Sequence, residues 1–203
     1  MTDGEDDSTT GIDQSADDPL AEVPDWDDEY LDRVSDRLLA SFDLEKDRHV
    51  RGERFPMYGE MRVLNRKQLF HPAISYGEHE LVEHLFVCRA EPVSVADLER
   101  LVDLGHELAD EWIEADEQHF GTRFSFAVVT DTIPDAVREY VEGFRERTLL
   151  NYGYYGDYEI NLVVVAPDRE TSVESEQADV ASAFRLWESS DDDSTGLLGR
   201  LLG

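Results

Sequence analysis

The stretch Leu81-Val82-Glu83-His84-Leu85-Phe86-Val87-Cys88 decides the fold of this chain. Apart from Glu83 and His84, its residues are apolar at odd and at even positions alike. A strand with apolar side chains on both faces is buried between two covering layers, as in a sheet that carries helices on both sides. The stretch therefore predicts a central strand over residues 80–90.

A second strand is predicted just before this one, over residues 57–70. Its residues alternate loosely, which is typical of a strand with one more polar face. The two faces carry Met61, Val63 and Leu69 on one side and Arg62, Leu64 and Arg66 on the other. His71-Pro72 ends the strand, and the short connection to residue 80 favours antiparallel pairing of the two strands.

Helical periodicity flanks the two strands. Upstream, apolar residues recur every fourth position from Trp26 to Phe42, which predicts an amphipathic helix over residues 25–46 with Asp25 as its N-cap. Downstream, Ser94 and Asp97 have the spacing of a capping box, and apolar residues then keep helical spacing to about residue 115.

The rest of the core follows the same alternation of strand and helix. Residues 124–129 are apolar apart from Ser125 and predict a third strand, Pro134-Asp135 begins a third helix, and Ile160 to Val165 predict a fourth strand. The order is helix, two strands, helix, strand, helix, strand. We therefore expect an α+β domain of α/β-like character, with a four-stranded mixed sheet covered by helices.

Charge is the dominant feature of the composition. The chain has 48 acidic and 18 basic residues, a formal net charge of -30, and its only lysines are Lys46 and Lys67. In roughly molar salt the Debye length falls to about 3 Å, so such self-repulsion is screened. We therefore expect a halophilic protein of a salt-rich cytoplasm. An acidic protein that mimics a partner is the alternative.

The acidic excess also marks the domain limits. Residues 1–23 are acidic and nearly free of large apolar side chains, so we expect them to be disordered. Residues 24–167 form the single domain, and residues 168–203 are an acidic linker with a short apolar tail. The chain has no apolar run of about 18 residues and no charged-then-apolar leader, so neither a membrane span nor a secretory signal is expected.

A basic island interrupts the acidic background. Between residues 46 and 67 there are seven basic and three acidic residues, a local balance of +4. Arginine suits phosphate recognition because it binds bidentately and is weakly hydrated. The alternative is that these side chains pair with the protein's own carboxylates. The binding candidates here are Arg48, Arg51, Arg54, Arg62, Arg66 and Lys67.

A tyrosine loop and the C-terminal tail are the other binding candidates. Tyr152, Tyr154 and Tyr155 lie in a glycine-rich segment and could stack on a base or a peptide, form an oligomer contact, or simply cap the sheet edge. The tail carries four leucines that could dock on a partner, pack on the domain, or fray. They are Leu197, Leu198, Leu201 and Leu202.

The sequence gives no support for catalysis. Asp157 and Glu159 are the nearest approach to the carboxylates of a restriction-endonuclease-class site, but Asn161 stands where that class needs a lysine. The six histidines lack the spacing of zinc ligands, and Cys88 is expected to be a buried small apolar residue. We therefore predict no catalytic residue, no metal and no cofactor.

Several short segments resemble an uncharacterised domain family found in haloarchaea and some anaerobic bacteria. They are Phe55 to Glu60, Leu69-Phe70, Glu80 to Phe86, Glu117 to Phe120 and Tyr152 to Asp157. The resemblance covers about residues 25–167. It implies the domain limits and a haloarchaeal setting, and it carries over neither an activity nor a site residue.

These observations favour a soluble cytoplasmic protein-interaction or self-associating domain. A protein partner or a second copy of the chain would bind through the tail, the tyrosine loop or the basic island, because tyrosine and arginine are enriched at interfaces. The alternative is a protein that binds or processes nucleic acid or nucleotides with the island and the tyrosines.

Overall fold

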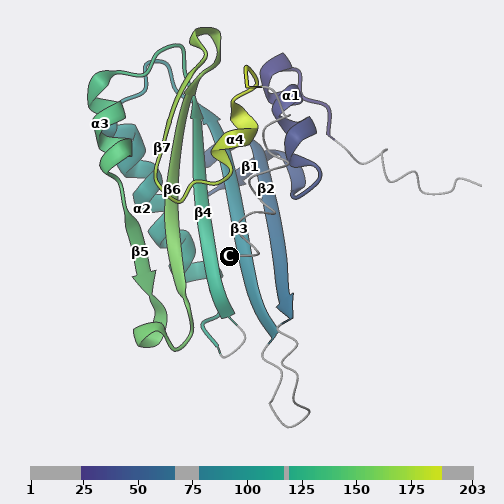
Figure 1. Ribbon diagram of the computed structural model, residues 1–203, viewed down its shortest axis with the longest axis vertical. Coiled ribbons are helices and arrows are strands. Elements are labelled where there is room, and N and C mark those ends of the chain that lie inside the picture. Colours follow the sequence, from purple (N-terminus) through teal and green to yellow (C-terminus); the bar gives the residue numbers. More distant parts are fainter. Residues whose placement is uncertain (1–23, 67–77, 117–118, 189–203) are drawn as a thin grey trace, which may run out of the picture.

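A mixed seven-stranded sheet with helices on both faces forms the centre of the molecule in this computed structural model (Figure 1). The structure describes residues 24–66, 78–116 and 119–188. The strand order is β1-β2-β3-β4-β6-β5, and β7 pairs with β6. β1, β2 and β3 form an antiparallel meander, whereas β3, β4 and β6 are parallel neighbours. β5 and β7 run antiparallel to β6.

The elements follow one another from α1 to α4. The strands are β1 (Asp43–Val50), β2 (Glu53–Arg66), β3 (Glu78–Arg89), β4 (His119–Val129), β5 (Glu146–Leu149), β6 (Asp157–Ala166) and β7 (Thr171–Glu174). The helices are α1 (Glu29–Leu38), α2 (Val95–Trp112), α3 (Asp135–Gly143) and α4 (Ala181–Phe184), with 3-10 turns η1 (Leu150–Gly153) and η2 (Pro167–Arg169). Within the described ranges no helix has both the length and the apolarity to cross a membrane.

The expected four-stranded sheet is wrong, because β1, β5 and β7 were not foreseen. β1 is an edge strand whose residues are mostly exposed or half-buried, so it lacks the alternation of a strand with one buried face. β5 and β7 have four residues each, too few to show a period. The sheet is nevertheless mixed and the fold is α+β, as expected.

The predicted first helix is too long. α1 ends at Leu38, and β1 begins at Asp43. Phe42 keeps the four-residue spacing of the helix, yet its buried side chain joins the core from the turn that follows. The N-cap is Asp28, whose side chain accepts hydrogen bonds from the backbone N–H of Tyr30 and Leu31.

Other predictions from the pattern are confirmed. β3 is a central strand, and Leu85, Phe86 and Val87 on it are fully buried. It pairs antiparallel with β2, as its short connection indicated. Ser94 and Asp97 form the predicted capping box at the start of α2.

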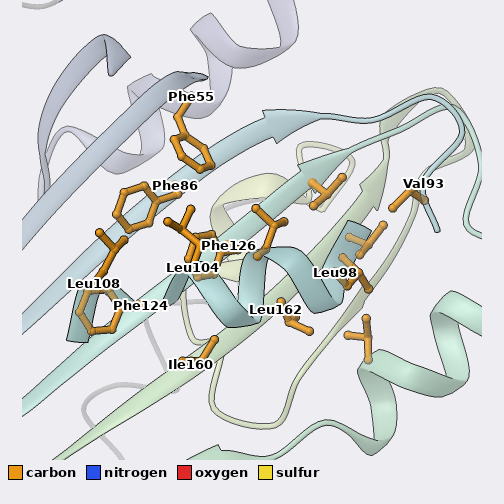
Figure 2. Close-up of a cluster of buried hydrophobic side chains, with 14 of the residues drawn as sticks. Phe55, Phe86, Val93, Leu98, Leu104, Leu108, Phe124, Phe126, Ile160 and Leu162 are labelled. Atoms are coloured by element: carbon orange, nitrogen blue, oxygen red, sulfur yellow. The ribbon is translucent and has the colours of Figure 1, made fainter. Parts of the chain in front are cut away.

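The larger core lies between the sheet and helices α2 and α3 (Figure 2). Phe55, Phe86, Phe124 and Phe126 line the sheet side, and α2 contributes its leucines Leu98, Leu101, Leu104 and Leu108. α2 approaches the sheet closely at Gly105, where a Cβ atom would lie 2.9 Å from Cδ1 of Ile160. This helix therefore packs closely against the sheet, and its last residue is Trp112.

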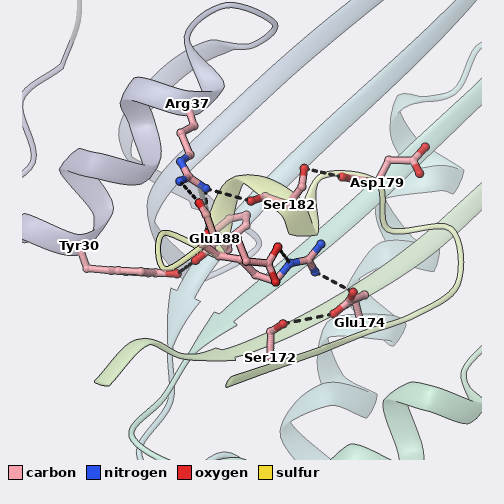
Figure 3. A network of polar contacts seen from close by, with 9 residues as sticks. Tyr30, Arg37, Ser172, Glu174, Asp179, Ser182 and Glu188 are labelled. Atoms are coloured by element: carbon pink, nitrogen blue, oxygen red, sulfur yellow. Dashed lines mark hydrogen bonds and ion pairs between the residues drawn. The ribbon is translucent and has the colours of Figure 1, made fainter. Parts of the chain in front are cut away.

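A second core covers the opposite face of the sheet, under α1 and α4. Side chains far apart in sequence join these two helices (Figure 3). The hydroxyl of Tyr30 donates a 2.6 Å hydrogen bond to the carbonyl oxygen of Phe184. The guanidinium of Arg37 donates to the carbonyl oxygens of Ser182, Arg185 and Glu188. These bonds hold the segment that follows β7 against α1.

Candidate functional site

A cavity of about 590 Å³ opens where α2 ends and β4 begins. The strands present alternate residues to it, because successive side chains on a strand point to opposite faces. α2 ends at Trp112, so within the described part of the chain no helix covers this end of the face, and the strand side chains there line the cavity. The lining consists of Arg48, Tyr58, Glu60, Arg62, Glu80, Val82, His84, Trp112, Ile113, Glu114, Asp116, His119 and Thr122.

A tyrosine–histidine pair forms the floor of the cavity. The hydroxyl of Tyr58 lies 2.7 Å from Nδ1 of His84 and 3.2 Å from Oε2 of Glu60. Burial lowers the pKa of His84 to about 4, so its imidazole is neutral at neutral pH. Burial also raises the pKa of Tyr58 well above its ordinary value. The pair therefore offers hydrogen bonds and flat rings, with no charge of its own.

The two arginines of the cavity are already engaged. The guanidinium carbon of Arg48 lies 4.9 Å from the ring centroid of Tyr58, and this arginine pairs with Glu45 at 2.6 Å. Arg62 lies 2.5 Å from a carboxylate oxygen of Glu60 and 3.0 Å from one of Glu80. Burial alone would raise the pKa of Glu60, but the hydrogen bond and charge of Arg62 outweigh burial and hold this pKa below its usual range.

The cavity has more carboxylates than arginines. Its described lining holds two arginines and four carboxylates, so these groups sum to -2. The carboxylates are Glu60, Glu80, Glu114 and Asp116. Among the residues that the structure describes, no group of three or more His, Cys, Asp and Glu side chains is arranged to hold a metal ion.

Four exposed apolar side chains, here together called the aromatic patch, lie on segments that meet at the same end of the sheet. It consists of Phe120 at the start of β4, Leu149 at the end of β5, and Tyr152 and Tyr154 in the turn after it. Their exposed fractions are 54%, 58%, 92% and 82%. Leu149 and Gly121 both pair with Asp157 in the sheet, which brings the ends of β4 and β5 together on either side of β6.

The turn that carries the patch has a defined backbone. Asn151, Tyr152 and Gly153 all have positive φ, at 45°, 59° and 87°. The backbone N–H of Leu150 donates to the carbonyl of Gly156 at 3.0 Å. Gly156 has no space for a side chain, since a Cβ atom there would lie 2.0 Å from the carbonyl oxygen of Phe120. The turn is thus fixed against the first residues of β4.

His119 connects the cavity to this turn. Its Nδ1 lies 2.6 Å from the carbonyl oxygen of Tyr155, and its Nε2 lies 2.9 Å from Oγ1 of Thr122. Both His119 and Thr122 line the cavity. The two surfaces therefore share one supporting side chain.

The basic island is divided by the fold. Arg48 and Arg62 line the cavity, whereas Arg51 pairs with Glu107 and Glu111 of α2 at 3.2 and 3.0 Å. Arg54 lies 2.5 Å from Asp47. Arg66 ends β2, but its side chain is not described. Lys67 lies outside the described ranges, as do the tail residues Leu197, Leu198, Leu201 and Leu202.

The tyrosine candidates have separate positions. Tyr152 and Tyr154 belong to the aromatic patch, whereas the side chain of Tyr155 is half-buried. Asp157 and Glu159 both contact Arg147, at 2.6 and 3.5 Å. Cys88 packs against the larger core, and burial raises the pKa of its thiol to about 12.

Sequence reasoning missed Tyr58, Trp112 and the pairing role of His84. The sequence does contain one indication of the cavity. Tyr58, Glu60 and Arg62 alternate along a strand, which places three side chains with polar end groups on one face. The sequence pattern around His84 does not indicate its contact with Tyr58, which arises from the pairing of β2 and β3. Trp112 sits at helical spacing and is indistinguishable by pattern from a core residue.

Comparison with known proteins gives a family and no relative. Residues 27–186 match the family model described as "Domain of unknown function (DUF8052)". Neither the curated proteins nor the solved structures contain a match to the chain.

Proposed function

The chain belongs to this family of unknown function, and we propose that its domain is a protein-interaction module that self-associates through the aromatic patch. One observation carries the proposal. Within the described ranges, four of the five large apolar side chains that are exposed lie on the neighbouring segments of the patch, and Val63 is the fifth. A concentrated apolar surface of this kind marks an interaction site, whereas scattered single residues do not.

The conformation of the turn adds support, because it leaves the rings of Tyr152 and Tyr154 in solvent. Tyr152 adopts a left-handed conformation that costs about 1 kcal/mol for a residue with a Cβ atom, whereas Asn151, also left-handed, tolerates it more readily. Tyr152 and Tyr154 gain little in return, since both rings remain in solvent. A contact that covers the two rings would offset this cost. Tyrosine suits such a contact, because its ring is apolar and its hydroxyl finds a polar partner.

A second copy of the chain is the occupant we propose. The most common oligomer is a two-fold dimer, in which the same patch meets itself and must be self-complementary. The surroundings of the patch meet this requirement: Arg147 and the carboxylate of Asp157 lie beside it and give it both signs of charge. Two chains of net charge -30 repel each other, so we propose that the dimer forms in a salt-rich cytoplasm.

Sedimentation velocity at high KCl concentration tests the proposal. We expect the unmodified chain to sediment as a dimer. The double variant Tyr152→Ser/Tyr154→Ser should weaken association at least about tenfold, because two buried rings are worth more than 1.4 kcal/mol. Val63→Ser is the matched control, because it removes the exposed apolar side chain that lies outside the patch.

Two results would refute self-association through the patch. One is a chain that stays monomeric at high salt and high concentration. The other is a dimer that both the double variant and the control leave intact. Deleting residues 196–203 in the same assay separates the patch from the leucine tail, since only tail docking would make the dimer sensitive to the deletion.

Nucleic-acid or nucleotide binding is the less favoured alternative. Each island arginine whose side chain is described pairs with a carboxylate of the chain itself, and the cavity that two of them line has an excess of carboxylates. A polyanion would have to displace these pairs. Fluorescence anisotropy with labelled single-stranded RNA in the same KCl buffer measures this function directly.

A further inference from the structure

His84, in the cavity beside the end of α2, has a ring nitrogen without a partner. The residue is nearly enclosed, with 8% of its surface exposed, and its Nδ1 contacts the hydroxyl of Tyr58 at 2.7 Å. Within the described part of the chain, no group hydrogen-bonds to its Nε2, and the one side-chain atom there that is both fully buried and unpartnered is Oε2 of Glu159. Nε2 of His84 therefore keeps some accessible surface, and it faces the cavity that His84 lines.

The contacts of Tyr58 indicate where the proton of His84 lies. Burial alone would raise the pKa of Glu60, but Arg62 holds it below its usual range, so this carboxylate is ionised and can only accept. The hydroxyl of Tyr58 therefore donates to Oε2 of Glu60 and accepts from Nδ1–H of His84. The same carboxylate oxygen lies 3.8 Å from Nδ1, which also favours a proton there. Nε2 thus presents a lone pair to the cavity and accepts hydrogen bonds.

The charged groups around this acceptor come in pairs. Arg62 contacts Glu60 and Glu80, at 2.5 and 3.0 Å. Arg48 contacts Glu45 at 2.6 Å. A charged ligand of either sign at Nε2 would compete with a member of these pairs, and the two remaining carboxylates of the lining are exposed, so water screens their charge. A neutral donor such as a hydroxyl therefore suits Nε2 better than an ion.

The rest of the lining also suits hydroxyl groups. Within the described residues Arg48 donates through Nη1 to Glu45, and its other N–H groups remain able to donate to an oxygen in the cavity. An acceptor at His84 and a donor at Arg48 match a ligand whose hydroxyls both donate and accept. Most small-molecule sites are lined mainly by apolar side chains, whereas most of the side chains here are polar or charged. This lining favours a strongly hydrated ligand over an apolar one.

Trp112 adds a flat apolar surface to these polar groups. Its half-buried ring lies edge-on to His84, with centroids 5.0 Å apart, and both residues line the cavity. A saturated ring that carries hydroxyls at its edge has apolar C–H faces, and such a face packs on an indole ring. The volume of about 590 Å³ lies within the range of small-molecule sites, roughly 300–1,000 Å³.

We propose that this cavity binds a neutral polyhydroxylated ring of the size of a monosaccharide. One hydroxyl donates to Nε2 of His84, and another accepts from Arg48. The C–H face of the ring packs on Trp112. The site is separate from self-association, because none of these three residues belongs to the aromatic patch.

Saturation-transfer difference NMR of the full chain tests the proposal, with glucose, galactose, mannose and myo-inositol as probes. We expect at least one of the four to receive saturation from the protein, and titration of that probe gives its dissociation constant. His84→Phe keeps a ring but removes Nε2, so the affinity should fall about fivefold, which corresponds to the loss of one hydrogen bond. Trp112→Leu removes the flat surface and should also weaken binding.

The chain offers a matched control, because it has a second tyrosine–histidine pair outside the cavity. Nδ1 of His106 on α2 lies 2.9 Å from the hydroxyl of Tyr158, and neither residue lines the cavity. His106→Phe makes the same substitution and breaks the same kind of contact, so the affinity for the probe should stay as in the unmodified chain. Circular dichroism of each variant checks that the fold is intact.

Three results would overturn the proposal. The first is no saturation transfer to any of the four probes. The second is an equal loss of affinity in His84→Phe and His106→Phe, which would indicate a general effect on the fold. The third is unchanged affinity in both His84→Phe and Trp112→Leu, which would place the bound probe outside the cavity. None of these results bears on the sedimentation of the aromatic-patch variants.

Discussion

The hydroxyl of Ser125 donates a 2.7 Å hydrogen bond to Oε1 of Glu83, between the parallel strands β4 and β3. Both side chains are buried, on the face of the sheet opposite the cavity. Asn161 on β6 continues the row and donates to the hydroxyl of Ser125 at 3.5 Å. A row of three buried polar side chains thus crosses the centre of this face of the sheet.

The first prediction concerns the buried carboxyl of Glu83. Burial raises its pKa, so the folded chain binds this proton more tightly than the unfolded chain does. The stability that the protonated Glu83 carboxyl contributes is therefore fully present below a pH of about 4.3, the pKa of Glu in the unfolded chain. It is lost as the pH rises through the higher pKa of the folded chain. We expect Glu83→Gln to stabilise the protein by about 1 kcal/mol at neutral pH, because the buried charge is removed while an acceptor for Ser125 remains.

Urea unfolding from pH 4 to pH 8 checks this prediction. The gain from Glu83→Gln should shrink towards acid pH, where the carboxyl is protonated. Glu99→Gln, at an exposed position on α2, is the control and should show no such trend. A Glu83→Gln protein that is less stable than the unmodified chain at neutral pH would contradict the role given to burial.

The second prediction concerns the start of α2 and has the opposite pH sign. Oδ2 of Asp97 accepts hydrogen bonds from the backbone N–H and the hydroxyl of Ser94, and these bonds lower its pKa. The stability that the Asp97 carboxylate contributes is therefore present above a pH of about 3.9, the pKa of Asp in the unfolded chain. It is lost as the pH falls through the lower pKa of the folded chain. We expect Asp97→Asn to cost about 1 kcal/mol at neutral pH and less in acid.

Chemical unfolding at neutral and acid pH measures the cost, with Asp103→Asn in the middle of the exposed face of α2 as the control. Equal stability of Asp97→Asn and the control at neutral pH would mean that the capping box contributes nothing measurable.

The third prediction compares two glycines. Gly156 has a φ of +74°, and a Cβ atom there would lie 2.0 Å from the backbone of Phe120, so Gly156→Ala must displace the turn. We expect a loss of at least about 2 kcal/mol, since both strain and a clash contribute. Gly143 ends α3 with open space around it, so Gly143→Ala should be neutral or slightly stabilising.

Thermal unfolding of the two variants provides the comparison. The account of a fixed turn fails if Gly156→Ala melts at the temperature of the unmodified chain. If Gly156→Ala is destabilised as expected, it should also associate less, because the turn that presents Tyr152 and Tyr154 is displaced.

Pattern alone located the interior of this fold better than its edges. β3 and α2 were recognisable because a doubly apolar strand and a capped amphipathic helix each have a strong local signature. β1 was not, because at the edge of a sheet its residues are largely solvated and lack a buried face. The regular spacing that ends at Phe42 was read as helix, although the chain turns after Leu38.

The candidate sites were foreseen only in part, for a similar reason. The tyrosine loop stood out by composition, and its tyrosines Tyr152 and Tyr154 form half of the aromatic patch. Phe120 and Leu149 join them only through the pairing of β4 and β5 with β6, which no local pattern shows. The basic island is continuous along the sequence, yet β2 directs Arg62 into the cavity, and Arg51 reaches α2 from the turn between β1 and β2.

The most direct test of the central claim is amide hydrogen exchange at high KCl, measured by mass spectrometry as the protein concentration is raised. If the aromatic patch is the surface through which two copies meet, peptides that cover residues 119–122 and 149–156 gain protection as the dimer forms, and peptides from α3 do not. Dimer formation with unchanged exchange in residues 149–156 would contradict the account and place the contact elsewhere.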